Sequence, residues 1–527
     1  MIKHYDLIVV GAGPAGLSAA IKAAGCGMKV IVFDENQRPG GQLFKQIHKF
    51  FGSKEHKAKI RGFRIGQELL KEAEEAGVQV LLNAEVMSIY EEKEVVFHYR
   101  DSIIHYKADN IVIATGAAEN MIPFEGWTLP GVIGAGAAQT MMNLHGVQPG
   151  EKILMVGSGN VGLVVSFQLL QAGCQVAAVI DAAPRVGGYG VHAAKVARTG
   201  VPFLMSHTVI KAEGTDHVTG AVIAQVDSHF SPIPGTEQHL DVDTICIAVG
   251  LSPMSQLSRI AGCEMLDSPG GLVPKVDAVG ATSIPGIFAA GDVAGIEEAS
   301  SAMIGGRIAG LAAALRVGYL DQESFDVQSA ALRHSLDQLR MGMFSKANRG
   351  RTDLTETDEG YPLSQTLLKK GYLEPWELEH FPSASMKKAG VHPVIECTQN
   401  IPCNPCQDAC RFGCISVGST ITKLPVINSS VKCMGCGLCV ATCSGQAIFL
   451  LDEDYAPGYA TVSLPYEFLP LPAVGETGIA LDRGGAELCN AEVVRVQKSP
   501  ATDGTVVLTM KIPAHMASQA RFFKKEG

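Results

Sequence analysis

The sequence of 527 residues lacks the features that mark several other classes of protein. No run approaches about 18 uninterrupted apolar residues, so we expect no membrane-spanning helix. The formal net charge is −10 and the isoelectric point is near 5.9, and this lack of a basic excess argues against nucleic-acid binding. From Met1 the chain runs directly into a predicted strand and a glycine loop, so we expect no signal peptide.

Signatures of bond-making catalysis are also missing. We find no Ser/His/Asp triad, no zinc-protease helix and no phosphate-transfer loop. Cysteine is scarce before residue 390, where four widely spaced thiols lie in apolar segments. We predict that these four are core residues: Cys26, Cys174, Cys246 and Cys263.

Cysteine is instead concentrated further along the chain, where nine of the 14 lie between Cys397 and Cys443. In a chain without a targeting segment this clustering favours metal ligation over disulfides and indicates the reducing cytoplasm. The length suffices for about three or four domains.

Residues 1–320 alternate short β-branched runs with segments of helical periodicity, which predicts an α/β fold with parallel sheets. After residue 454, short alternating runs predict a small β domain. The predicted strands are Tyr5–Val10, Lys29–Phe33, Val78–Leu82, Asn110–Ala114, Lys152–Val156, Gln175–Ile180, Thr244–Val249, Gly286–Ala290, Tyr459–Leu464 and Glu492–Gln497.

The first of two glycine loops follows strand Tyr5–Val10 and precedes a helix predicted to begin near Leu17. The first glycine permits a tight turn, the second lets the backbone approach a pyrophosphate, and the third allows close helix–strand packing. Asp34 ends the next strand, 18 residues past the loop, where its carboxylate can accept hydrogen bonds from a ribose. The loop residues are Gly11, Ala12, Gly13, Pro14, Ala15 and Gly16.

The second glycine loop follows strand Lys152–Val156. Asp181 ends the next strand, 19 residues past this loop, and its charge would repel a 2′-phosphate, which favours NAD over NADP. The alternative is that this site holds an adenine nucleotide structurally and never turns it over. The loop residues are Gly157, Ser158, Gly159, Asn160, Val161 and Gly162.

With these loops in this order, residues 1–320 resemble the two-dinucleotide-domain flavoproteins, a family that includes glutathione reductase and thioredoxin reductase. Further motifs that carry the resemblance are Gly40-Gly41-Gln42-Leu43, Ala114-Thr115-Gly116 and Phe288-Ala289-Ala290-Gly291-Asp292. The resemblance implies two Rossmann-like domains. FAD would be held by the first loop together with Asp34, Gly41, Gln42, Thr115, Gly116, Gly291 and Asp292, and NAD by the second loop with Asp181.

In that family the last aspartate, here Asp292, binds the ribityl chain of FAD, and the following helix, here beginning near Ala299, points its N-terminus at the flavin. One departure is informative. The disulfide reductases of the family carry a closely spaced cysteine pair, and residues 1–390 contain none, so we predict that the chain is not a disulfide reductase.

The stretch from Gly116 to Gln139 resembles the flavoprotein subunits of opine dehydrogenases, hydrogen cyanide synthase and dye-linked L-proline dehydrogenases, and the likeness extends over most of residues 1–450. Those proteins work with a second flavoprotein subunit that oxidises an amino or imino acid, which implies a hetero-oligomer. The resemblance also makes His48, after the Gly-Gly-Gln-Leu turn, a candidate flavin-pocket residue; the other interpretation is an ordinary loop side chain.

The cysteine cluster consists of two runs that resemble bacterial two-cluster ferredoxins. The second run has the spacing Cys-x2-Cys-x2-Cys-x3-Cys, which lets one loop wrap a [4Fe-4S] cluster while the fourth thiolate reaches a neighbouring cluster. The first run is stretched to Cys-x5-Cys-x2-Cys-x3-Cys. The predicted ligands are Cys397, Cys403, Cys406 and Cys443 for cluster one, and Cys433, Cys436, Cys439 and Cys410 for cluster two.

Two features depart from the ferredoxin pattern. Arg411 and Ser444 stand where a proline usually follows the fourth cysteine, and the stretched spacing after Cys397 leaves Cys414 as an alternative ligand. Aligning the runs places Cys414 opposite Ala447, so we predict that it is a small buried side chain. Zinc is the rival metal, although it favours two-cysteine knuckles with longer spacers.

These observations predict a domain order. An FAD-binding domain is split over residues 1–118 and 252–325, around an NAD-binding domain at 119–251. A helical and loop connecting segment covers 326–390, a ferredoxin-like 2[4Fe-4S] α+β domain covers 391–452, and a small β domain covers 453–527.

The leading hypothesis is an oxidoreductase subunit that relays electrons between a partner dehydrogenase of amines, amino acids or imino acids and NAD or another acceptor, through FAD and two [4Fe-4S] clusters. A second hypothesis is a self-sufficient NADH-dependent oxidoreductase that exchanges electrons with ferredoxin or a small acceptor. A third is an assembly subunit with a structural adenine nucleotide in the second site.

Overall fold

The structure is a computed structural model that describes residues 2–90, 92–348, 351–383 and 390–525. Residues 349–350 and 384–389 of the predicted connecting segment, and 526–527 of the predicted C-terminal domain, lie outside the described residues. The chain divides into two compact units. Unit 1 comprises residues 1–50, 55–119 and 250–339, and unit 2 comprises residues 51–54, 120–249 and 340–527.

Unit 1 is built on a seven-stranded sheet in the order β3-β2-β1-β6-β5-β4, with β19 paired to β6. Strands β1, β2, β3, β6 and β19 are parallel, whereas β5 pairs antiparallel with β6 and with β4. The strands are β1 (Lys3–Val10), β2 (Val30–Asp34), β3 (Gln79–Leu82), β4 (Glu85–Ile89), β5 (Glu94–Tyr99), β6 (Ser102–Ile113) and β19 (Ile287–Ala289).

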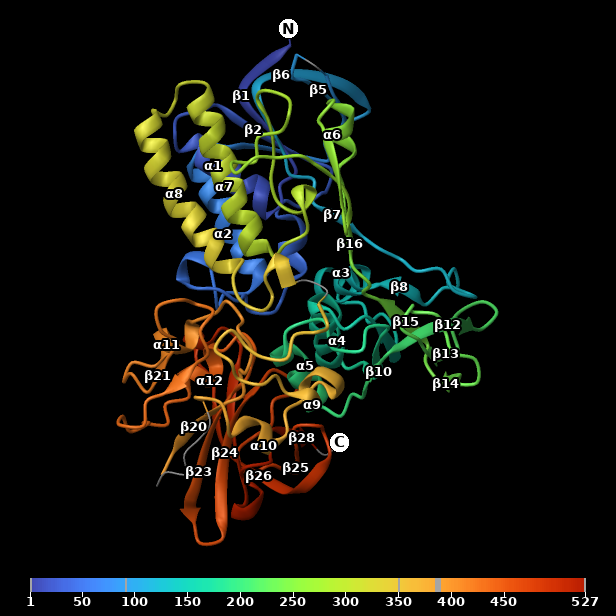
Figure 1. Ribbon diagram of the computed structural model, residues 1–527, viewed down its shortest axis with the longest axis vertical. Coiled ribbons are helices and arrows are strands. Elements are labelled where there is room, and N and C mark those ends of the chain that lie inside the picture. Colours follow the sequence, from blue (N-terminus) through green and yellow to red (C-terminus); the bar gives the residue numbers. More distant parts are fainter. Residues whose placement is uncertain (1, 91, 349–350, 384–389, 526–527) are drawn as a thin grey trace. The chain divides into compact units, whose positions relative to one another are not determined.

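Helices α1 and α7 pack against each other and against this sheet, and α8 packs on α7 (Figure 1). Glycines make the α1–α7 approach close, because a Cβ at Gly306 would lie 2.1 Å from the backbone oxygen of Ala15. The helices of unit 1 are α1 (Pro14–Ala24), α2 (Gly62–Glu75), α6 (Gln256–Ile260), α7 (Ala299–Arg316) and α8 (Gln322–Leu339). Two short ribbons complete the unit: β7 (Ala117–Glu119) with β16 (Leu251–Pro253), and β17 (Met265–Ser268) with β18 (Gly271–Pro274).

Unit 2 begins with a second parallel sheet, in the order β11-β10-β9-β15-β8. Its strands are β8 (Val132–Gly134), β9 (Lys152–Val156), β10 (Gln175–Asp181), β11 (Phe203–Met205) and β15 (Thr244–Ile247), and its helices are α3 (Ala135–His145), α4 (Asn160–Gln171) and α5 (Gly190–Ala197). A three-stranded antiparallel sheet is inserted before β15: β12 (His207–Glu213), β13 (Gly220–Gln225) and β14 (Gln238–Leu240).

The rest of unit 2 contains a seven-stranded sheet in the order β20-β23-β24-β27-β26-β25-β28, whose neighbouring strands are all antiparallel (orange to red in Figure 1). Its strands are β20 (His392–Ile395), β23 (Ile448–Ala456), β24 (Tyr459–Tyr466), β25 (Thr477–Leu481), β26 (Glu487–Gln497), β27 (Val506–Pro513) and β28 (Phe522–Lys525). Strand β23 therefore crosses the domain boundary that we predicted after residue 452.

The cysteine region lies between β20 and β23. Its elements follow the order β20–α11–β21–β22–α12–β23, with α11 (Pro405–Ala409), α12 (Leu438–Thr442) and an antiparallel pair of β21 (Ile415–Ser416) and β22 (Val426–Ile427). Two further short helices, α9 (Gln365–Lys370) and α10 (Pro375–Leu378), precede it.

The predicted α/β class with parallel Rossmann-like sheets is confirmed. Every predicted strand is present, with ends that differ by a few residues, except that β6 is much longer than the predicted Asn110–Ala114. The helix predicted near Leu17 begins earlier, at Pro14, because proline has no N–H to leave unpaired and suits a first helical turn. Among the described residues, no helix is both long enough and apolar enough to cross a membrane.

Candidate functional site

The first glycine loop, in unit 1, has a shape that follows from its three glycines. A Cβ at Gly11 would lie 2.3 Å from the backbone oxygen of Ala114, and a Cβ at Gly16 would lie 1.8 Å from that of Gly11, so neither position has room for a side chain. A Cβ at Gly13, by contrast, would meet nothing within 4 Å. The loop therefore leaves open backbone at Gly13, at the start of α1, where a pyrophosphate group would fit.

Asp34 lies at the end of β2 and is 6% exposed. Its Oδ2 accepts a hydrogen bond from the backbone N–H of Ala12 at 2.7 Å, and its Oδ1 accepts one from the N–H of Asn36 at 2.8 Å. The carboxylate thus holds the loop in place. The Gly40-Gly41 turn closes on the same loop, since Gly40 donates its N–H to the oxygen of Ala12 at 2.7 Å.

The second glycine loop, in unit 2, repeats this arrangement. A Cβ at Gly157 would lie 2.3 Å from the oxygen of Ala248 and one at Gly162 would lie 2.0 Å from the oxygen of Gly157, whereas Gly159 again has nothing within 4 Å. Asp181 accepts from the N–H of Ser158 at 2.7 Å, as Asp34 does from Ala12.

A segment that the sequence analysis did not single out also contacts the second loop. Gly188 donates its N–H to the oxygen of Ser158 at 2.9 Å, and Tyr189 donates its N–H to the side-chain oxygen of Asn160 at 2.8 Å. The signal for it was the Gly187-Gly188 pair, which follows Asp181 much as Gly40-Gly41 follows Asp34. Helix α5 begins directly after this segment.

The remaining predicted FAD residues are also in unit 1. Thr115 donates its hydroxyl to the oxygen of Met254 at 2.6 Å, and the N–H of Met254 donates to the oxygen of Gly116 at 2.9 Å, which joins the ends of β7 and β16. Gln42 is exposed, after Gly41 at the start of a short 3₁₀ helix. Asp292 is half-buried, after Gly291, and accepts from the N–H of Glu297 at 3.1 Å. Helix α7 begins at Ala299, where we predicted it.

His48 is half-buried in the same unit, and its ring stacks on Phe50 with 5.4 Å between the ring centroids. Nearby in the chain, burial lowers the pKa of the Lys45 ammonium, opposed by the charge of Glu119.

The predicted ligands of cluster one lie together in unit 2. Cys443, from the second run, interacts electrostatically with Cys397, Cys403 and Cys406 from the first. Burial, followed by the charge of Cys443, raises the pKa of Cys397 to about 12, and burial also raises the pKa of Cys403 and Cys406. The backbone of Gly52 pairs with that of Cys403.

The predicted ligands of cluster two are grouped separately. Cys439 interacts electrostatically with Cys433, Cys436 and Cys410, and Cys433 with Cys436 and Cys410. Burial raises the pKa of Cys439 and of Cys433. Each run thus contributes three cysteines to one group and one to the other.

The two groups fit the donor set of iron–sulfur clusters. Grouped thiols with raised pKa values lose their protons only to a strong positive charge, which a multi-iron cluster supplies. In the part of the chain that the structure describes, no three His, Cys, Asp or Glu side chains are close enough to hold a single metal ion. The four ligands of a [4Fe-4S] cluster bind four different irons, so they lie farther apart than the ligands of one ion.

The four cysteines before residue 390 lie in the apolar cores, as predicted. Cys174, Cys246 and Cys263 are buried and Cys26 is half-buried. Burial raises the pKa of Cys26, Cys174 and Cys263.

The chain is similar to known flavoprotein oxidoreductases. A sequence profile described as pyridine nucleotide-disulphide oxidoreductase matches residues 5–306. An opine oxidase subunit of Rhizobium meliloti is 32% identical over 338 residues, covering 60% of this chain and 64% of that protein. Hydrogen cyanide synthase subunit HcnB of Pseudomonas aeruginosa is 29% identical over 328 residues, covering 59% of this chain and 70% of that protein.

A solved structure, that of L-proline dehydrogenase from P. horikoshii, has the same fold with a TM-score of 0.50 and 20% identity, covering 64% of this chain and 60% of that one. The matches cover fewer residues than the likeness over most of residues 1–450 that we expected from the sequence. The chain spans less than two thirds of the opine oxidase polypeptide. The profile nevertheless covers more than half of the sequence, and it ends before the cysteine region. The chain therefore belongs to the pyridine nucleotide-disulphide oxidoreductase family, whose members are FAD- and NAD-binding oxidoreductases.

Proposed function

We propose that this protein is the electron-transfer subunit of a complex that oxidises an amine, amino acid or imino acid. In this proposal a partner flavoprotein dehydrogenase oxidises the substrate, and electrons pass between it and NAD or another acceptor through FAD and two [4Fe-4S] clusters of this chain. The reducing cytoplasm would keep the eight clustered thiols available for iron.

The grouping of the cysteines carries this proposal. Because each run gives its fourth cysteine to the other group, the two groups form as a pair, which is the ligand pattern of two-cluster ferredoxins. We infer a ferredoxin-like domain from this grouping and from the order of α11 and α12, each of which is followed at once by a fourth cysteine, Cys410 or Cys443.

The names of the relatives support the partner. The opine oxidase relative and hydrogen cyanide synthase HcnB are each named as subunits of a larger enzyme. We therefore propose a hetero-oligomer with a second flavoprotein subunit.

Each part of the chain has a role in this proposal. FAD, when bound, exchanges both a hydride pair and single electrons, and iron–sulfur clusters exchange single electrons. The first loop with Asp34 would hold the pyrophosphate and ribose of FAD, and Asp292 would bind its ribityl chain. The second loop with Asp181 would hold NAD. The negative charge of Asp181 would disfavour NADP, because it repels the 2′-phosphate.

Anaerobic purification of the full chain with metal, sulfide and flavin counts tests the proposal. We expect about eight irons, about eight sulfides and about one FAD per chain. A preparation that contains zinc or no metal in place of iron contradicts the relay.

Further experiments separate the electron-transfer subunit from the two alternative functions. Bleaching of the flavin by NADH contradicts a purely structural nucleotide in the second site. Co-purification of a second flavoprotein from the native source supports the complex, whereas an isolated chain that passes electrons from NADH to ferredoxin supports the self-sufficient oxidoreductase.

A further inference from the structure

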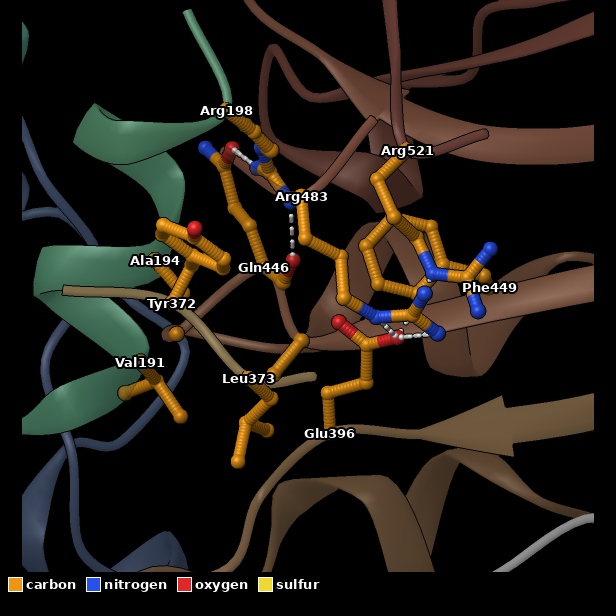
Figure 2. A pocket seen from close by; sticks show the side chains of 12 residues that line it. Val191, Ala194, Arg198, Tyr372, Leu373, Glu396, Gln446, Phe449, Arg483 and Arg521 are labelled. Atoms are coloured by element: carbon orange, nitrogen blue, oxygen red, sulfur yellow. Dashed lines mark hydrogen bonds and ion pairs between the residues drawn. The ribbon is translucent and has the colours of Figure 1, made fainter. Parts of the chain in front are cut away.

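Unit 2 contains a buried cluster of charged side chains around one small cavity (Figure 2). Arg198, Glu396, Arg483 and Arg521 line one small cavity and are 4%, 6%, 7% and 1% exposed. They come from the end of α5, the end of β20, the loop after β25 and the residue before β28. Charged side chains this deeply buried are rare unless they are paired.

Two of the arginines share one carboxylate oxygen. Arg483 donates from Nε to Oε1 of Glu396 at 2.9 Å, and Arg521 donates from Nε to the same atom at 2.6 Å. Arg483 also pairs with the same oxygen of Glu396 from Nη2 at 2.7 Å, so both guanidinium groups converge on this carboxylate. Glu396 is therefore an anion that neutralises one of the two cations.

The third arginine has no carboxylate hydrogen-bonded to it. Arg198 donates to the backbone oxygen and the side-chain oxygen of Gln446, both at 2.9 Å, and its Nε has no hydrogen-bond partner in the described structure. Glu396 is the one acidic residue among the described residues that line the cavity. The cluster of three arginines and one glutamate therefore carries a net positive charge.

The balancing negative charge must lie close by, since unpaired buried charge is costly. The cavity has room for about one water molecule, which is too little for a polyatomic anion. The cysteines of group one are adjacent. Glu396 directly precedes Cys397, and Gln446 donates its N–H to the oxygen of Cys443 at 3.1 Å. Arg198 interacts electrostatically first with Glu396, then with Cys443 and then with Glu467.

We propose that Arg198, Arg483 and Arg521 are the counter-charge of the cluster held by Cys397, Cys403, Cys406 and Cys443, and that Arg198 raises its reduction potential. This inference rests on the proposed iron–sulfur function. A [4Fe-4S] cluster with four thiolates is an anion, and reduction adds further negative charge, which a buried site of low dielectric disfavours. A fixed guanidinium nearby opposes that effect, so in this proposal the arginines make the cluster easier to reduce.

The second group of cysteines has a different environment. Arg411 directly follows its ligand Cys410 but is exposed, so solvent screens its charge. Arg411 is thus a matched control for Arg198, with the same side chain close in sequence to a ligand but without the burial.

An EPR-monitored redox titration of the anaerobically purified full chain tests the proposal. In Arg198→Gln we expect the equilibrium constant for one-electron reduction of one cluster to fall at least tenfold, equivalent to about 59 mV, and that of the other to change much less. Arg198→Lys restores the charge and should restore the potential to within about threefold, or about 28 mV. Arg411→Gln should change neither potential by more than that.

A second variant guards against loss of folding. Gln446→Glu keeps the shape of the side chain and places a carboxylate against Arg198, so it should lower the same potential if charge is the cause. Unchanged potentials in both Arg198→Gln and Gln446→Glu would overturn the counter-charge role, and so would equal shifts in Arg198→Gln and Arg198→Lys. If these variants still contain the expected iron, the proposed function is not affected by either result. Wild-type protein that contains no iron would overturn both the counter-charge role and the proposed function.

Discussion

The backbone N–H of Cys414 donates a hydrogen bond to the Sγ of Cys410 over 3.2 Å. In the second run the N–H of Ala447 lies in the same relation to the Sγ of Cys443, at 3.4 Å. In each run, the residue four positions after the fourth cysteine thus donates its backbone N–H to the sulfur of that cysteine. In the second run this residue is Ala447, which has no thiol. Donation of N–H groups to cluster sulfurs is one of the ways in which proteins set cluster potentials.

From this relationship we expect Cys414→Ala to keep the full iron content, because the substitution leaves the backbone donor in place. Cys414 is 3% exposed, so the lost sulfur should lower the free energy of unfolding by only about 1 kcal/mol. Cys443→Ala, the matched variant, should lose about half of the iron. Iron and sulfide assays check both. Loss of iron in Cys414→Ala would instead favour the alternative in which Cys414 replaces Cys397.

Gly13 and Gly16 should respond differently to the same substitution. In Gly13→Ala the new methyl group meets no protein atom, so the stability of the flavin-free chain should change by less than about 0.5 kcal/mol, while the affinity for FAD should fall at least about tenfold. In Gly16→Ala the methyl group would overlap the oxygen of Gly11, so stability and FAD binding should fall together. Urea unfolding and flavin titration separate the two. Normal FAD affinity in Gly13→Ala would place the pyrophosphate elsewhere.

Asp181→Asn should relax the choice between NADH and NADPH. The amide keeps one oxygen that can accept from the N–H of Ser158, at the loss of the second oxygen that accepts from Ala183, and it removes the charge that repels a 2′-phosphate. We expect the ratio of the two dissociation constants to move toward NADPH by about tenfold, with FAD content unchanged. Calorimetric titration of both nucleotides provides the measurement. If the wild-type chain binds neither reduced nucleotide, the second site is not an NAD site.

Glu396→Gln should be strongly destabilising in the metal-free protein. The variant leaves Arg483 and Arg521 buried without a counter-ion, which costs about 3–5 kcal/mol for similar buried pairs. Glu487→Gln is the control, since Glu487 pairs with Lys524 at 2.9 Å in an exposed bridge and should cost less than about 1 kcal/mol. Chemical denaturation of the metal-free proteins compares them, and equal losses would contradict the electrostatic account.

The stability of the chain should depend on His56 at mildly acidic pH. Its ring Nε2 lies 3.1 Å from the carbonyl oxygen of Ser335, and burial lowers the pKa of the ring below its ordinary value of 6.5. Below that pH the unfolded chain takes up the proton more readily than the folded chain. This group should therefore reduce the free energy of unfolding as pH falls from about 6.5 toward its folded pKa, by at most about 1.4 kcal/mol per pH unit. Chemical denaturation from about pH 7 to about pH 5.5 should give a shallower pH dependence for His56→Gln than for the wild type. Equal slopes would contradict the assignment.

Sequence patterns predicted those elements that depend on neighbouring residues in the chain. The parallel strands are short apolar runs bounded by glycine turns, and β9 (Lys152–Val156) has the predicted ends. The exchange of fourth cysteines between the runs was implied by the resemblance to two-cluster ferredoxins, and as a ligand assignment it stays a prediction. By contrast, the N-terminal half of β6 and its partners β4 and β5 were missed, because their alternation includes many partly exposed and polar residues.

The arginine cluster illustrates what local patterns cannot show. Arg198 is nearly 200 residues from Glu396 in the sequence, and Arg521 is a further 125 residues along. No local sequence pattern marks any of these residues, and the same residues on a protein surface would need no explanation. Only the folding of α5 against the C-terminal sheet brings them to one cavity, so their charge excess becomes visible with tertiary structure and not before.

The strand order β20-β23-β24-β27 has a practical consequence for anyone who wishes to transplant the cysteine region into another protein. A fragment cut after residue 452 would sever β23 partway, strip away the strand that covers its edge and uncover the apolar side chains of Phe449 and Leu451. The cysteine region therefore cannot be moved alone. Any graft must carry the whole C-terminal sheet with it.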